Sequence, residues 1–111
     1  MLREIPETDW KVFRHFHPIA LERFCERILS EIAQSISSGK QSSHERYLAA
    51  FKLIQRRDKE IAKVFNDPRR SAALEQLACI QGHELLTEEE MSRFSDETRE
   101  FVQGLLDIRR S

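Results

Sequence analysis

The chain of 111 residues has little of the two residue types that make turns, with only three glycines and three prolines. An all-β domain needs a turn about every ten residues, so this scarcity excludes that class. No hydrophobic run approaches the roughly 18 residues of a membrane span, and the first residues contain no apolar signal segment. These absences predict a cytoplasmic protein without a membrane partner.

Motifs that carry chemistry are also missing: the chain has no glycine-rich phosphate loop and no Gly-x-Ser-x-Gly nucleophile motif. Its two cysteines, Cys25 and Cys79, fall among apolar residues, where a thiol acts as a small hydrophobe rather than a nucleophile. His15 and His17 would point apart in a helix, so they do not share a face as two metal ligands would. The sequence therefore predicts no enzymatic activity, no metal and no cofactor.

What the chain does have is a helical pattern. Apolar residues make up 40% of it and recur at steps of three and four nearly everywhere, which is the period of an amphipathic helix. This pattern predicts an all-α, single-domain bundle of five or six helices covering residues 1–111. The three main helices are expected at about 18–37, 43–66 and 68–81, and residues 1–7 are expected to be extended or frayed.

Polar capping residues and a proline mark the expected helix starts. Ser42, with Glu45 three residues later, has the pattern of a capping box, and Thr87 begins an acidic stretch of the same kind. Pro18 has two interpretations, since it either opens the first long helix or kinks a longer one. We favour a break at Pro18, because a continuous helix would leave Phe16 on the side away from the main apolar face.

The helix expected over 68–81 is apolar nearly all round. Asp67 is placed to cap this helix and Pro68 to occupy its first turn. A helix with little polar surface is enclosed by its neighbours, so we expect this one to be the central and most buried element. Two further helices should follow, the first beginning at Thr87 and the second capped by Ser95.

One acid, Asp58, lies in the middle of an apolar arc on the 43–66 helix. Its neighbours on that arc are Phe51, Ile54, Ile61 and Phe65. A carboxylate buried there needs a partner, and Arg70 is the best candidate for a buried Asp58–Arg70 pair. Two alternatives stay open. Either the arc is an oligomer interface where Asp58 meets a partner, or Asp58 organises a ligand-binding bundle as a buried acid.

A cationic row follows the other side of the same helix. Its members stand at steps i, i+4, i+7 and i+11 and are Lys52, Arg56, Lys59 and Lys63. Stacked like charges repel by roughly a few tenths of a kcal/mol per pair, which an anionic partner would offset. The row has no interleaved aromatic residue for base stacking, and Glu60 lies beside it. We favour a solvated face, with an acidic protein or a nucleic acid as the alternative partners.

Charge and apolar residues together suggest a surface function. Residues 38–70 hold nine basic and four acidic groups (+5), whereas residues 71–111 hold four and nine (−5). Five apolar residues fall outside the main arcs and are expected to form a second apolar surface: Val12, Phe16, Ile19, Leu53 and Val64. The leading prediction is a non-catalytic protein-interaction module that associates with itself as a homodimer. The alternative is a nucleic-acid-binding module that uses the cationic row.

Overall fold

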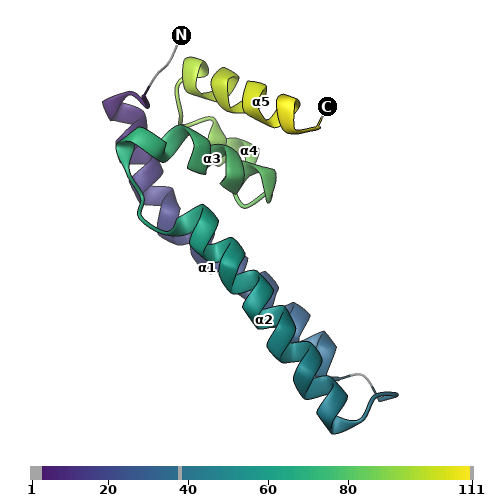
Figure 1. The fold of residues 1–111 in the computed structure, drawn as a ribbon. Coiled ribbons are helices and arrows are strands. Elements are labelled where there is room, and N and C mark those ends of the chain that lie inside the picture. Colours follow the sequence, from purple (N-terminus) through teal and green to yellow (C-terminus); the bar gives the residue numbers. More distant parts are fainter. Residues whose placement is uncertain (1–3, 38, 111) are drawn as a thin grey trace.

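The computed structural model describes residues 4–37 and 39–110, and this part of the chain contains five α-helices and no strand. The elements are α1 (Glu7–Ile36), α2 (Ser43–Phe65), the 3-10 turn η1 (Arg70–Ala72), α3 (Ala73–Gly82), α4 (Glu88–Met91) and α5 (Asp96–Arg110). Helices α1 and α2 form a long antiparallel hairpin whose far half projects as an arm, while α3, α4 and α5 gather as a head against its other half (Figure 1). The molecule is therefore elongated, measuring 54 × 30 × 25 Å, and the predicted all-α class is confirmed.

Helix α1 runs unbroken through Pro18, so the favoured break at that residue is wrong. The head covers Phe16, and the centroids of the Phe16 and Phe94 rings lie 6.4 Å apart. Phe13 and Phe24, before and after the proline, are buried in the same core. Burial on both sides of Pro18 outweighs the backbone hydrogen bond that a proline cannot make.

Helix α2 follows its prediction closely, whereas the start of α3 does not. The Ser42 hydroxyl accepts a hydrogen bond from the Glu45 amide at 3.1 Å, and the Glu45 carboxylate accepts one from the Ser42 amide at 3.3 Å, which confirms the capping box. Asp67 does not cap the next helix. It has a left-handed backbone with φ of 55°, Pro68 lies in the connection, and α3 begins only at Ala73.

Helix α3 is the most buried element, as the sequence predicts, with six of its ten residues buried. It contacts α1, α2 and α5, so it joins the head to the hairpin. The core also reaches the N-terminal segment that we expected to be extended or frayed. Residues 1–3 of that segment lie outside the described residues, but Ile5 is fully buried and Glu7 already belongs to α1.

The starts of α4 and α5 carry the predicted caps. Thr87 and Glu90 form a reciprocal capping box for α4, and the Ser95 hydroxyl accepts a hydrogen bond from the Thr98 amide at 3.3 Å. An unforeseen residue completes the start of α5. Asp9 of α1, only 3% exposed, accepts hydrogen bonds from the Ser95 amide (3.0 Å), the Ser95 hydroxyl (2.6 Å) and the Thr98 hydroxyl (2.6 Å). This carboxylate lies at the positive end of the α5 dipole and fixes α5 against α1.

Candidate interaction surfaces

The arm has two sides of different chemistry, and the order of residues around the α1–α2 seam determines them. Ile28 of α1 and Leu53 of α2 are buried in that seam. A cation precedes each seam residue, since Arg27 comes before Ile28 and Lys52 before Leu53. An exposed aliphatic residue follows each of them, Leu29 in α1 and Ile54 in α2. Because the two helices run in opposite directions, moving forward by one residue in either helix turns the side chain toward the same side of the hairpin. One side of the arm is therefore apolar and the other is basic.

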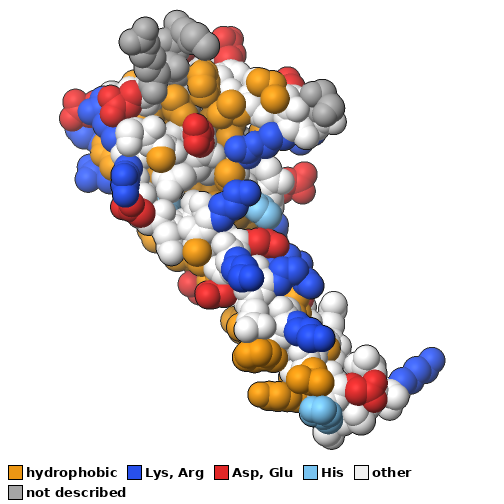
Figure 2. Space-filling model, viewed as in Figure 1, with side chains coloured by type: hydrophobic (Ala, Val, Ile, Leu, Met, Phe, Trp, Pro, Cys, Tyr) orange, Lys and Arg blue, Asp and Glu red, His pale blue; other side chains and the backbone are white. Residues whose placement is uncertain are grey.

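We name the apolar side of the arm the apolar face. Its members leave between 47% and 64% of their surface exposed and are Leu29, Ile36, Tyr47, Phe51 and Ile54. The rings of Tyr47 and Phe51 stack with 6.4 Å between their centroids. Figure 2 shows hydrophobic side chains gathered along one edge of the arm. The largest exposed apolar patch of a soluble protein is often functional, so the apolar face is a candidate interface.

Asp58 lies at the end of the apolar face nearest the head, and it is exposed. The predicted buried pair of Asp58 with Arg70 is therefore wrong. Arg70 is half-buried, and its Nε donates to the carbonyl oxygen of Ile5 at 3.2 Å. The arc around Asp58 stays open because the arm consists of two helices, and no other described element covers that side.

The second apolar surface that we expected is also absent, because its members belong to the interior. Phe16, Leu53 and Val64 are at most 9% exposed, and Val12 and Ile19 are half-buried beside the core. The head covers Phe16, and the hairpin seam encloses Leu53. The exposed apolar surface is instead the arc of α2 whose periodicity predicts a core position.

The basic side of the arm carries the predicted cationic row, and the fold extends it. Lys63 lines a cleft of about 470 Å³ together with Arg109 and Arg110, the last two residues of α5. We name the whole set the basic track: Lys52, Arg56, Lys59, Lys63, Arg109 and Arg110. Within the described residues none of these six side chains forms a salt bridge. Figure 2 shows Lys and Arg side chains along this edge of the arm, continuing to the notch beside the head.

Glu60, which the sequence places beside the row, is already paired. Its Oε1 accepts a hydrogen bond from Arg57 at 2.8 Å, although Glu60 also lines the cleft. Arg57 in turn donates to both carboxylate oxygens of Glu31 across the seam, at 3.1 and 2.8 Å. These hydrogen bonds hold the pKa of Glu31 below its usual value. Arg57 is shared between Glu31 and Glu60, so this trio keeps one net negative charge. The six cations of the basic track outnumber that charge, so the track keeps a positive field.

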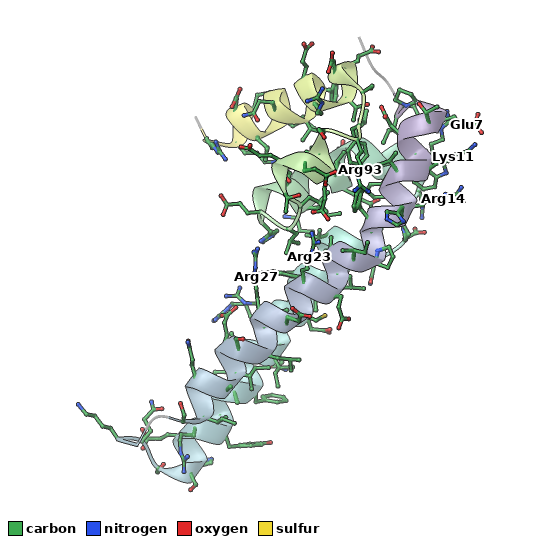
Figure 3. The ribbon with its side chains drawn as sticks, turned by 180° about the vertical axis from the view of Figure 1, so that it is seen from behind. Glu7, Lys11, Arg14, Arg23, Arg27 and Arg93 are labelled. Atoms are coloured by element: carbon green, nitrogen blue, oxygen red, sulfur yellow. The ribbon has the colours of Figure 1, made fainter. Side chains whose placement is uncertain are left out.

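A separate set of contacts on the basic side attaches the head to α1. Arg23 donates to both carboxylate oxygens of Glu90, at 2.7 and 2.9 Å, and to the Leu85 carbonyl at 2.8 Å. Arg27 donates to two backbone carbonyls of the turn after α3. Figure 3 shows both arginines where α1 meets the head, whereas Lys11 lies on the outer side of α1. The bonds from Arg23, with the capping bonds to Thr87, lower the pKa of Glu90 to about 2.

Other kinds of site find little support in the described chain. Residues 4–37 and 39–110 contain no group of three or more His, Cys, Asp or Glu side chains that could hold a metal ion. Cys25 and Cys79 are not bonded to each other, and Arg109 Nη1 donates to the Cys79 sulfur at 3.3 Å. No helix in the same ranges combines the length and hydrophobicity needed to cross a lipid bilayer.

Comparisons with family models, with curated proteins and with solved structures give no match to this chain. Function is therefore inferred from the two sides of the arm. Sequence reasoning missed Arg109 and Arg110 as extensions of the cationic row, since only the packing of α5 on α3 brings them to the cleft that Lys63 lines. The one available signal was a pair of cations in the last turn of the final helix.

Proposed function

We propose that this chain is a non-catalytic interaction module, and that a second copy of the same chain covers its apolar face. The observation that carries this proposal is the row of half-exposed large side chains on both helices of the arm. In a pair of amphipathic helices, each helix buries one apolar stripe against the other. In a four-helix arrangement, each helix contacts two neighbours and so buries a wider apolar surface. A second hairpin laid on the apolar face completes such an arrangement. We also propose a cytoplasmic location.

The size of the apolar face suits a dimer. Its five side chains, each about half exposed, offer on the order of 400 Å² of apolar surface per copy. A standard interface buries about 800 Å² per partner, and a little more than half of that area is apolar. The apolar face therefore supplies the apolar share of one standard interface, and the polar residues at its edges supply the rim.

Charge selects the antiparallel arrangement, in which the tip of one arm lies over the head end of the other. The head end of the face is acidic, with exposed Glu22 and Asp58, whereas the tip, residues 39–46, carries one net positive charge. Like charges would meet if the two arms were parallel, and opposite charges meet if they are antiparallel. An isologous twofold contact centred between Phe51 and Ile54 places Tyr47 of one copy opposite Asp58 of the other. The Tyr47 hydroxyl is then positioned to donate to that carboxylate.

Disulfide trapping tests both the occupant and its orientation. Tyr47→Cys and Asp58→Cys are made in separate chains in which Cys25 and Cys79 are replaced by serine. The two purified variants are mixed and oxidised gently, and cross-linked chains are separated by mass. We expect the mixture to yield a disulfide-linked dimer, because the antiparallel contact brings these two positions together. Each variant alone should yield little cross-linked dimer, since the single cysteines of two identical chains would lie at opposite ends of the antiparallel interface.

A pair of substitutions on α2 supplies the matched control. Phe51→Glu buries a charge in the proposed interface and should abolish the cross-link, whereas Gln55→Glu, one position beyond Ile54, should leave it intact. The proposal fails if the mixture remains uncross-linked. It also fails if each cysteine variant cross-links with itself as readily as with the other, because that result indicates a parallel or non-specific contact.

A further inference from the structure

We propose that the basic track binds the phosphate backbone of double-stranded nucleic acid, independently of the self-association described above. The part of the track on α2 covers eleven residue steps from Lys52 to Lys63. At the rise of an α-helix this is a straight row about 16 Å long. Arg109 and Arg110 line the same cleft as Lys63 and add two cations at that end of the row. A linear array of cations of this kind fits a linear array of anions.

The alignment of its cations sets the track apart, because other described cations such as Lys11 and Arg14 also form no salt bridge but do not stand in one row. Five arginines outside it are held in salt bridges with acids of the chain: Arg23, Arg57, Arg69, Arg93 and Arg99. The six cations of the track have no such acid among the described residues, and four of them stack on one helix face, where they repel one another. Phosphates that neutralise them also release counterions from the nucleic acid, which favours binding.

The side chains around the track favour a duplex over a single strand. Proteins that bind single strands stack the bases on aromatic side chains, and neither the track nor the residues lining the cleft include a Phe, Tyr or Trp. A duplex keeps its bases stacked and presents one charge per about 1.7 Å of axis, so phosphate contacts alone are sufficient. Binding through phosphates reads no bases, and it is therefore expected to be independent of sequence.

The position of the track is compatible with a dimer. The apolar face and the basic track lie on opposite sides of the arm, so a second copy on the apolar face leaves both tracks accessible. Phe51→Glu, which removes self-association, consequently leaves the track intact. A failure of the dimer proposal and a failure of this one are therefore distinguishable in the same set of proteins.

Fluorescence anisotropy with a short labelled DNA duplex tests the proposal. We expect binding at about 20 mM salt that weakens steeply as salt is added, with a slope of log affinity against log salt of about −5 for six phosphate contacts. Lys59→Glu and Arg110→Glu should each weaken binding about tenfold and make that slope less steep. Lys11→Glu, which changes the net charge equally on the outer side of α1, should weaken binding less than about twofold.

Three results would overturn the proposal. The first is an unchanged anisotropy of the duplex at low salt with the wild-type chain. The second is an equal loss of affinity in Lys11→Glu and Lys59→Glu, since this indicates attraction by net charge rather than by the track. The third is tighter binding of poly-glutamate than of the duplex at the same salt, which identifies an acidic protein as the partner.

Discussion

At the scale of single residues, Glu90 links the head to the hairpin. It closes the capping box that starts α4, and it accepts two hydrogen bonds from Arg23 of α1. The side chain of Glu90 is 13% exposed and that of Arg23 is 37% exposed, so solvent screens this ion pair only in part. A bidentate pair in such surroundings stabilises more than an open surface pair does.

The pKa of Glu90 sets an expected dependence of stability on pH. That pKa falls from 4.5 to about 2 on folding, so the contribution of the pair is complete above about pH 4.5 and is lost as the pH falls toward about 2. Glu90→Gln keeps the capping pattern and removes the charge, and it should lower the free energy of unfolding at pH 7 by about 2 kcal/mol. Urea unfolding at a series of pH values measures this difference, which should shrink through that window.

The neighbouring acid provides the control for this measurement. Glu89 forms an exposed pair with Arg93, which lies in the turn just after α4. Glu89→Gln should therefore change the unfolding free energy by less than about 0.5 kcal/mol at any pH. If Glu90→Gln behaves like Glu89→Gln, the Arg23–Glu90 pair does not attach the head as described.

Residue-level patterns in the sequence reveal caps but not the long-range partners of those caps. Ser42, Thr87 and Ser95 were recognisable because each acts on residues within one helical turn. Asp9 was not recognisable, because it meets Ser95 across 86 positions of chain. Its burial with three donors depends on the packing of α5 against α1, which the spacing of neighbouring residues does not predict.

At the scale of elements, Pro18 lies inside the continuous helix α1, so its effect on the free energy of unfolding can be measured. Proline in a helix interior removes one backbone hydrogen bond and crowds the carbonyl one turn earlier. Pro18 is exposed, so its ring contributes little to the core. Pro18→Ala should therefore raise the free energy of unfolding by about 1 kcal/mol or more, after allowing for the greater freedom of the unfolded chain. Thermal and urea unfolding measure this change.

A substitution in the opposite sense tests the same element. Ala33 is exposed in the arm portion of α1, and Ala33→Pro should lower the unfolding free energy by about 3 kcal/mol. A loss of stability in Pro18→Ala would contradict this view of α1. It would mean that a bend at Pro18 is required to place the head.

The elements also show why helical periodicity predicted the helices but not their environment. The apolar arc of α2 was identified by its spacing, and Phe65 at its head end is buried as expected. Phe51 and Ile54, on the same arc, are about half exposed because the head does not reach that far along the arm. Periodicity identifies an apolar side, but it does not determine which element, if any, packs against it. Asp58 was misplaced for the same reason.

At the scale of the whole molecule, the head and the arm differ in how completely they are packed. In the head, α3 lies between the hairpin and α5, and the core residues are almost fully buried. Among the described residues, the arm has its seam as its interior, and it exposes apolar residues on one side and cations on the other. We infer that the arm is the working part of the protein, with the head holding its two helices in register.

The mass of the unmodified chain in solution tests this account most directly. Sedimentation equilibrium at concentrations of about ten to one hundred micromolar should give a species of about 26 kDa, twice the 13.1 kDa of one chain. The apparent mass should fall as the sample is diluted. A mass of 13.1 kDa at every concentration would contradict the account, because the apolar face would then be stable in water without a partner.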